Sequence, residues 1–450
     1  MFFRLHRYKK VTLIGLTACV LATLYITREK TFKNFTDPHS WRLGFDLPGI
    51  LTEKFANTKR PSEETKSSIV VSVESTPAPI DIKENVQSLC SKDFSRYNGY
   101  RNNTYLQSSI IISKYKFVTC VLPKTGCSFL KRFLYFIGSN KSISSPFIYS
   151  LYDAHVLPLN TTNKLTAKQL EEVQREYKFA LFVRDPYKRL FSGYVDKIFS
   201  RYDYWDFLSK RIINKVRPSA PDKSKKCGTD TRFTDVVRFL VSEISEGKSV
   251  DSHFMPIHFL SNPCSAKYDF IGKLENFKTD AATLFSELHV KYQSTLDEIE
   301  TGSIKDELKD VADIVFSVKN NKRFNENPCF DIHNITRRLW RKLQIKGLIS
   351  YKFNLTITKK ELLSLNKTQF LSILTKYNKK SSSEPDCHKA RKFSYLEAYY
   401  SVPQKDLEDL AKLFSTECEL WDYPFKPDII FDSDKRISTG PITYFNFDDV

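Results

Sequence analysis

Extended apolar runs that pass directly into amphipathic helical patterns recur through the middle of the chain. The first run is Tyr115–Leu122, and a helical pattern begins after it at about Ser128. Two more runs follow, Lys178–Val183 and Tyr268–Lys273, and the last leads to a helical pattern from about Thr279. Continuous apolar strands that alternate with amphipathic helices indicate a buried parallel sheet covered on both faces. We therefore expect an α/β fold.

The residues after the second run carry the signals of a helix start. Asp185 suits the helix cap, and Pro186 suits the first helical turn, where its missing N–H is no loss. The next apolar residues recur at helical spacing and predict one buried face; they are Tyr187, Leu190, Phe191, Tyr194 and Ile198.

The N-terminus has a different pattern, a basic segment followed by an uncharged apolar run. We expect a cytosolic tail at residues 1–10, a signal-anchor helix at 11–27 and a luminal stem at 28–89. The preceding basic residues place the N-terminus in the cytosol, and the short run suits the thinner membranes of the early secretory pathway. A cleaved signal peptide is the alternative, although no Ala-x-Ala site follows.

From about Cys90 the composition becomes that of a globular domain. We expect one domain over residues 90–430, with an insertion at about 290–395, and a C-terminal tail at 431–450. Within the insertion, Thr336–Lys346 is basic and amphipathic. A glycan-binding or membrane-facing helix is one interpretation, but a solvated helix face is the preferred one.

The composition indicates the chemical class of a binding partner and the cellular compartment of the domain. The formal net charge is +18, which favours an anionic partner such as a nucleotide, an acidic glycan or a phospholipid headgroup, although a generally basic surface is the alternative. Seven Asn-x-Ser/Thr sequons and eight cysteines outside the apolar run fit an oxidising lumen, where nucleic acid is not an expected partner. The spacing leaves the disulfide connectivity open, and no Cys/His cluster has the spacing of a zinc site.

Two loops at strand ends are the candidate chemistry. Pro123–Ser128 precedes a helix, so backbone N–H groups and Lys124 can cradle an anion there. Arg184 follows the second strand, and Ser192 lies two turns into the next helix; together they offer bidentate and hydroxyl donors to a phosphate. Two anion sites fit a nucleotide phosphorylated at its 5′ and 3′ positions. Either corner alone is also compatible with an ordinary strand–helix turn.

Four blocks resemble the Golgi carbohydrate sulfotransferases, in particular the chondroitin/dermatan type that modifies galactosamine. They are Leu122–Arg132, Phe182–Tyr194, Asp251–Glu275 and Glu417–Tyr423, in the family's order. The chain departs from the family pattern at Phe129 and Leu130, where Asn and Trp are usual. It also has Ser261 in place of a cysteine three residues before Cys264.

The resemblance implies a P-loop-NTPase-like, doubly wound parallel sheet with flanking helices, and 3′-phosphoadenylyl sulfate as the sulfuryl donor, with no metal. The donor-binding residues that it implies are Pro123, Lys124, Thr125, Gly126, Cys127, Ser128, Phe129, Arg184, Asp185, Pro186, Arg189 and Ser192. The implied acceptor is an anionic glycan, and the implied location is the Golgi membrane with the catalytic domain in the lumen.

The acceptor hydroxyl needs a base, and histidine is the natural choice near neutral pH. His155, between the two donor segments, is slightly preferred to His253 in the third block, and Lys124 is the catalytic cation. Two other functions compete with sulfuryl transfer. A P-loop kinase would need a Walker A motif, which the chain lacks, and a membrane-anchored binder of acidic glycans would bind no adenine nucleotide.

Overall fold

The computed structural model describes residues 81–97, 108–139, 143–200, 205–291, 293–432, 434, 437 and 443–446. The segments expected to form the cytosolic tail and the signal anchor lie outside these residues, as does nearly all of the expected stem. In the described part of the chain, no helix combines the length and the apolar character needed to cross a membrane.

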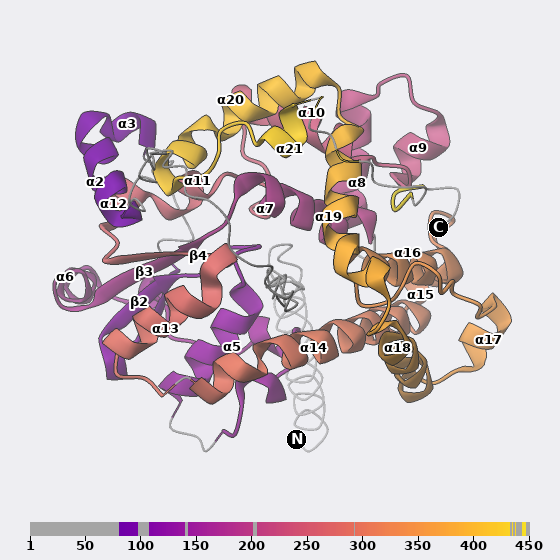
Figure 1. Cartoon of the computed structure of the whole chain (residues 1–450), viewed down its shortest axis with the longest axis horizontal. Helices are drawn as coiled ribbons and strands as arrows, with labels where there is room; N and C mark the ends of the chain where they lie inside the picture. The colour runs from indigo at the N-terminus through magenta and orange to yellow at the C-terminus, as the bar shows by residue number, and fades with distance from the viewer. Residues whose placement is uncertain are drawn as a thin grey trace, which may run out of the picture. The chain divides into compact units, whose positions relative to one another are not determined.

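A small mixed sheet lies beside the helices α5 and α13 in Figure 1. Its strands are β1 (Ile110–Ile112), β2 (Phe117–Cys120), β3 (Lys178–Val183) and β4 (Phe270–Lys273), in that spatial order. β2, β3 and β4 are parallel, whereas β1 is antiparallel to β2. Only the short segment η1 (Ser113–Tyr115) and Lys116 connect β1 to β2, and so tight a connection can join antiparallel strands only.

The α/β class is therefore confirmed, whereas the expected doubly wound parallel sheet is found only in part, because β2, β3 and β4 are parallel and β1 is antiparallel. Their spatial order follows the chain, without the reversal that defines a doubly wound sheet. The pattern of apolar runs detected the three parallel strands and missed β1, which has three residues.

Alternate residues of the central strand are buried on opposite faces of the sheet. Ala180 and Phe182 pack with α5 (Cys127–Gly138) and α13 (Phe277–Glu287). Leu181 and Val183 pack on the other face, in a core shared with the helices α2 (Ile82–Lys92), α6 (Ala167–Glu176) and α20 (Gln404–Trp421). Cover on both faces explains why these strands read as continuous apolar runs.

The helix after β3 begins as expected. The Asp185 carboxylate accepts hydrogen bonds from the backbone N–H groups of Tyr187 (2.8 Å) and Lys188 (3.1 Å), which caps α7 (Pro186–Gly193). The chain then continues without a break into a π-helical segment, η5 (Tyr194–Phe199). Such segments are rare and occur frequently at functional sites.

The predicted apolar face of α7 is buried in the largest core, which also contains side chains from α8 (Trp205–Val216), α10 (Phe233–Ser245), α19 (Pro385–Tyr400) and α20. The other helices outside residues 293–400 are α3 (Phe94–Tyr97), α9 (Asp222–Cys227), α11 (Ile257–Ser261), α12 (Pro263–Ala266) and α21 (Asp428–Phe431). Three single-turn 3-10 segments lie between α5 and α6, namely η2 (Pro146–Ile148), η3 (Asp153–His155) and η4 (Thr162–Lys164). A fourth, η6 (Leu274–Asn276), precedes α13.

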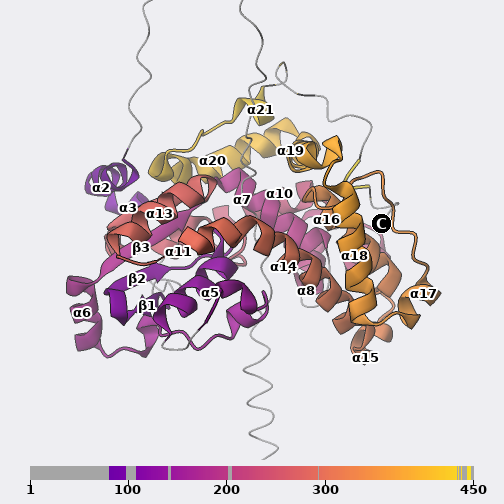
Figure 2. The ribbon, with the colours of Figure 1, turned by 60° about the horizontal axis from the view of Figure 1, so that its bottom comes forward.

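Residues 293–400 form a second region, which we call the helical region. Its helices are α14 (Gln293–Lys319), α15 (Lys322–Asn325), α16 (Ile332–Ile345), α17 (Lys359–Ser364), α18 (Lys367–Ser381) and α19 (Pro385–Tyr400). α14 packs against α16 and α18 around a separate apolar core, and Figure 2 shows α14 reaching from this region towards α5.

The preferred interpretation of the basic stretch Thr336–Lys346 as a solvated face is wrong. Arg338, Arg341, Lys342 and Lys346 on and just after α16 are all buried. Lys342 and Lys346 have an acidic partner on α14, because Glu307 lies 2.7 Å from Lys342 and 2.9 Å from Lys346. Arg338 and Arg341 instead donate hydrogen bonds to backbone carbonyls. Charge complementarity between two helices has replaced solvation.

Two disulfides tie distant segments together. Cys90 on α2 is bonded to Cys264 on α12, and Cys227 on α9 is bonded to Cys329 in the helical region. Cys264 thus has a partner although Ser261 replaces the usual nearby cysteine. Of the described cysteines, Cys120, Cys127, Cys387 and Cys418 carry free thiols.

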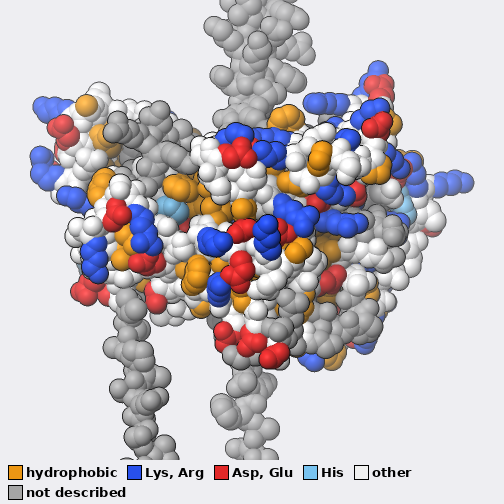
Figure 3. All heavy atoms as spheres, turned by 90° about the horizontal axis from the view of Figure 1, so that it is seen from above, with side chains coloured by type: hydrophobic (Ala, Val, Ile, Leu, Met, Phe, Trp, Pro, Cys, Tyr) orange, Lys and Arg blue, Asp and Glu red, His pale blue; other side chains and the backbone are white. Residues whose placement is uncertain are grey.

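One face of the molecule shows how its charged side chains are distributed. In Figure 3, Lys and Arg side chains are spread over the face shown and are intermixed with Asp, Glu and apolar side chains. This face therefore fits a generally basic surface at least as well as a continuous track for a polyanion.

Candidate active site

The loop between β2 and α5 has an unusual backbone just before the start of the helix. Lys124 has φ of 67° and Gly126 has φ of 82°, both in the left-handed region. A non-glycine residue there is uncommon and is often found at ligand-binding loops. The Thr125 hydroxyl donates a hydrogen bond to the Leu122 carbonyl (2.9 Å), which closes the loop on itself. Gly126 occupies the N-cap of α5, and no side-chain cap is described there.

The loop after β2 and the turn after β3, which we call the two strand-end corners, are in direct contact. The guanidinium group of Arg184, just after β3, donates a hydrogen bond to the backbone carbonyl of Lys124 (3.1 Å). Sixty residues separate the two positions in the chain. The parallel pairing of β2 with β3 brings their carboxyl ends to one edge, where ligands of α/β sheets bind.

Arg189 stabilises the loop after β2 from the buried side of the site. Its guanidinium group donates to the carbonyls of Pro123 (3.1 Å), Met255 (2.7 Å) and Ser252 (2.8 Å). The side chain is buried and joins the first loop to the third sequence block. These contacts with backbone carbonyls give Arg189 a structural role in the site. Ser192, on the same helix, is also buried.

The other loop residues divide between backbone and packing roles. The side chains of Cys127, Ser128 and Phe129 are buried in the first turn of α5. Phe129 lies in the apolar core against Phe133 and Phe277, so only its backbone can face a ligand. Pro186 occupies the first turn of α7, and Asp185 is used as its cap.

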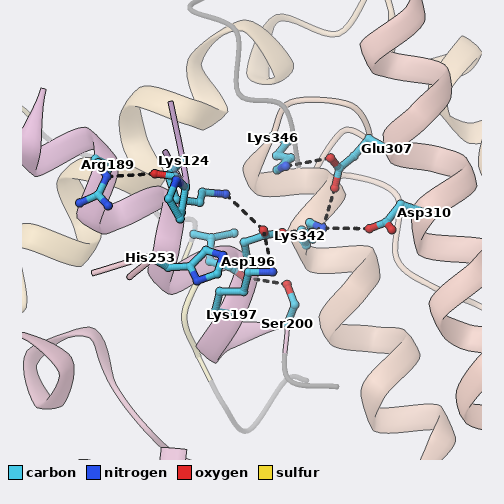
Figure 4. A network of polar contacts seen from close by, with 12 residues as sticks. Lys124, Arg189, Asp196, Lys197, Ser200, His253, Glu307, Asp310, Lys342 and Lys346 are labelled. Atoms are coloured by element: carbon cyan, nitrogen blue, oxygen red, sulfur yellow. Dashed lines mark hydrogen bonds and ion pairs between the residues drawn. The ribbon is translucent and has the colours of Figure 1, made fainter. Parts of the chain in front are cut away.

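The ammonium group of Lys124 lies in a buried network of charges, drawn in Figure 4. Its Nζ is 3.2 Å from an oxygen of Asp196, and both side chains are almost completely inaccessible to solvent. Burial alone would raise the pKa of the Asp196 carboxyl. Lys124, Lys342 and Lys197 outweigh burial and hold that pKa well below its ordinary value.

Lys197 adds a further cation to the same place. Its Nζ lies 3.7 Å from Asp196 and is fully buried. Burial lowers the pKa of the Lys197 amine to about 8, although Asp196 acts in the opposite direction. The amine is therefore mostly protonated at neutral pH and begins to lose its charge in mildly alkaline solution.

Both candidate bases lie near these cations. His155 is half-buried, with its Nδ1 3.4 Å from the Lys131 ammonium group, and burial together with Lys131 and Lys197 holds its pKa well below the ordinary value. His253 is more deeply buried, and its Nδ1 pairs with an Asp251 oxygen at 2.7 Å. Burial lowers the pKa of His253 to about 4 in spite of Asp251. Both rings are neutral near pH 7, the form that can accept a proton.

The sequence interpretation missed Asp196, Lys197, Glu307 and Lys342. One signal was present, an Asp–Lys pair inside the otherwise apolar segment Tyr194–Phe199. Charged residues in such a segment indicate buried partners. In the described residues, no group of three or more His, Cys, Asp or Glu side chains is placed to hold a metal ion.

A model of the sulfotransferase family matches residues 107–342. The chain belongs to the sulfotransferase family. The match covers both strand-end corners, both candidate histidines, the whole of α14 and most of α16. It thus runs well into the segment that was expected to be an insertion.

Named relatives agree with the motif resemblance. The chain is 30% identical to carbohydrate sulfotransferase 14 of Danio rerio over 196 residues, which cover 43% of this chain and 52% of that protein. It is 26% identical to carbohydrate sulfotransferase 11 of Rattus norvegicus over 180 residues (39% and 51%). It is 30% identical to carbohydrate sulfotransferase 9 of Homo sapiens over 171 residues (37% and 38%).

The chain spans about half the length, or less, of these relatives. No solved structure matches it. The resemblance to carbohydrate sulfotransferases that the sequence blocks indicated is confirmed.

Proposed function

We propose that this protein transfers a sulfuryl group from 3′-phosphoadenylyl sulfate to a hydroxyl group of a glycan. The observation that carries the proposal is the hydrogen bond from Arg184 to the Lys124 carbonyl, because it joins the two predicted anion sites at one edge of the sheet. Family membership supports the reaction class. The names of the relatives support a carbohydrate acceptor.

The residues at this edge fit an anionic donor. Lys124 and the start of α5 would hold the 5′-phosphosulfate, and Arg184 with Ser192 would hold the 3′-phosphate. Arg189 would keep the first loop in register with α7. The donor, when bound, supplies an activated sulfur whose bond to the 5′-phosphate oxygen breaks as a bond to the sugar oxygen forms. Lys124 stabilises the negative charge that develops on the departing phosphate.

His155 would act as the base that takes the proton from the sugar hydroxyl. Its neutral imidazole suits that task; Nε2 has almost no exposed surface, but the residue as a whole is only half-buried and Val156 beside it is exposed. His253 is less accessible, and its contact with Asp251 fixes its ring orientation. We assign His253 to shaping the same pocket and keep it as the alternative base.

The acceptor class is a galactosamine-containing glycosaminoglycan or a related glycoprotein glycan, in line with the sequence blocks and the basic net charge. We propose the Golgi lumen as the site of action, with the chain held by residues 11–27. Acceptor identity and location rest on resemblance alone, whereas the proposed donor site is supported both by resemblance and by the contact between Arg184 and Lys124.

The reaction is tested by transfer of radiolabelled sulfate from 3′-phosphoadenylyl sulfate to a panel of desulfated glycosaminoglycans, followed by disaccharide analysis. The full-length protein is compared with Lys124→Met. We expect labelled product from the wild-type protein on a galactosamine-containing polymer and none above background from the variant. Glycan binding without transfer by either protein would favour a non-enzymatic binder of acidic glycans and would refute the proposal.

A further inference from the structure

The candidate donor lysine is held by a carboxylate that is itself held from another part of the fold. One oxygen of Asp196 is 3.2 Å from Lys124 Nζ, and its other oxygen is 3.0 Å from Lys342 Nζ. Asp196 belongs to the π-helical segment η5, and Lys342 belongs to α16 in the helical region. The carboxylate thus bridges the loop after β2 and a helix that begins more than two hundred residues later.

Lys342 is fixed in turn by acids of α14. Glu307 lies 2.7 Å and Asp310 3.6 Å from its Nζ, and Lys346 contacts the second oxygen of Glu307 at 2.9 Å. Figure 4 shows the chain of contacts from Lys124 through Asp196 and Lys342 to α14. The side chains of Lys124 and Lys342 have no exposed surface.

We propose that Asp196 and Lys342 are positioning residues of the donor site: Lys342 holds one oxygen of Asp196, so that the other oxygen orients the ammonium group of Lys124. This inference rests on the proposed function. It adds that the helical region completes the site, although no residue of that region was implicated by the sequence blocks. A long, flexible lysine side chain needs such a partner to keep one orientation.

The arrangement also explains how several lysines share one buried place. Asp196 offsets the mutual repulsion of Lys124, Lys197 and Lys342, and α14 offsets the remaining charge of Lys342. Loss of Asp196 would leave three ammonium groups close together. Lys197, which Asp196 helps to keep protonated, would then lose its proton at lower pH.

The groups that act on Lys197 come from every element packed around it. They are Asp196 on η5, Lys124 in the loop, Lys342 on α16, Asp310 on α14, His155 on η3 and His253 before α11. Asp196 raises the pKa of Lys197 and Lys342 lowers it. Substitutions at these two positions therefore shift the protonation of Lys197 in opposite directions.

The test is titration of the full-length protein with 3′,5′-bisphosphoadenosine, together with sulfuryl-transfer kinetics, between about pH 6 and about pH 9. The variants are Asp196→Asn, Lys342→Met and Lys342→Arg. Arg341→Met is the matched control, because Arg341 is a buried cation on the same helix whose guanidinium donates to the Thr443 carbonyl (2.8 Å) and not to Asp196.

We expect kcat to fall by about tenfold or more in Asp196→Asn and Lys342→Met, and Lys342→Arg to recover part of the loss. The pH above which nucleotide affinity declines should move down in Asp196→Asn and up in Lys342→Met. Arg341→Met should change neither kcat nor the pH dependence. If Lys342→Met does not fold, the near-isosteric Asp196→Asn still gives the decisive profile.

The experiment distinguishes failure of the proposed function from failure of the positioning role. If the wild-type protein binds no bisphosphoadenosine, the proposed function fails. If it binds, but Asp196→Asn has unchanged kcat and an unchanged pH profile, the positioning role is overturned and the network is only structural. A loss of thermal stability in all variants, with kinetics unchanged, would have the same meaning.

Discussion

The strand-end region, residues 117–200, and the helical region, residues 293–400, are built on different principles. The first buries apolar side chains on both faces of β2 and β3, and its polar residues act at the ends of those strands. The second buries its apolar core beside a stripe of paired charges between α14 and α16. The first kind of order is visible in a local pattern, whereas the second appears only when two helices are placed side by side.

The difference matters for function because the two regions meet at Asp196. A resemblance of sequence blocks directs attention to Lys124 and Arg184, and those residues do lie together. The charges that surround Lys124 nevertheless include Lys342 and Glu307 from the helical region. A binding loop can therefore be recognised without the residues that hold it in place.

The largest contrast between the regions should come from removing one buried cation in each. In Lys124→Met, kcat for sulfuryl transfer should fall by roughly 10³-fold, because the charge on the departing phosphate loses its fixed counter-charge. Arg341→Met, in the helical region, should lower the melting temperature and leave kcat near the wild-type value. Steady-state transfer assays and thermal melts on the same preparations measure both effects.

Equal losses of kcat in the two variants would contradict this contrast. Such a result would give Lys124 no greater role in the reaction than a buried cation of the helical region.

The base assignment sharpens the account of the strand-end region. In His155→Ala, kcat should fall by about 10²-fold while the affinity for bisphosphoadenosine stays unchanged, because the base acts on the acceptor. His253→Ala serves as the comparison, and its loss should be smaller. Normal turnover by His155→Ala with intact nucleotide binding would exclude His155 as the base.

The pH profile is a smaller effect that links the two regions. The pKa of His155 is held well below 6.5, so the neutral base is present throughout the neutral range and the rate should fall only when the pH drops through that lowered pKa. Lys197, which shares Asp196 with Lys124, has a pKa of about 8. Above that pH the site loses the positive charge of Lys197, so the rate should decline there.

We therefore expect a plateau around neutral pH, measured as kcat/KM across the range. A maximum near pH 6.5 with a steep fall on its acidic side would indicate a base with an unshifted pKa and would contradict the burial of His155.

The smallest expected effect concerns stability at the joint between α16 and α19. Gly347 has φ of +66°, and a Cβ added there would lie 2.3 Å from the Cys387 carbonyl oxygen. Gly347→Ala should therefore destabilise the protein by more than the about 1 kcal/mol expected from the backbone conformation alone. Gly247→Ala is the matched control, because its φ is +70° but nothing lies within 4 Å of the added Cβ. Denaturant unfolding that gives equal losses for both would argue against the close packing of α16 on α19.

The parts of the fold that sequence analysis predicted are those set by local chemistry. The cap at Asp185 and the apolar face of α7 follow from neighbouring residues, and the three parallel strands follow from their apolar runs. β1 escaped detection because three residues form no recognisable pattern and a tight turn decides its direction.

The parts that could not be predicted depend on long-range pairing. Glu307 and Asp310 on α14, and Lys342 and Lys346 at the end of α16, occur at spacings that share one helix face. Each stripe alone is equally compatible with a solvated surface. Only the packing of α14 on α16 shows that the two stripes neutralise each other. The pairing of Lys124 with Asp196, 72 residues away, is likewise a property of the fold.

The most direct test of the central claim is the affinity of the full-length protein for 3′,5′-bisphosphoadenosine, measured by calorimetry for the wild type, Lys124→Met and Arg184→Met. If the two strand-end corners form one donor site, the wild-type protein binds the nucleotide and each single substitution weakens binding. Absence of binding by the wild-type protein, or equal affinity in all three proteins, would contradict the account.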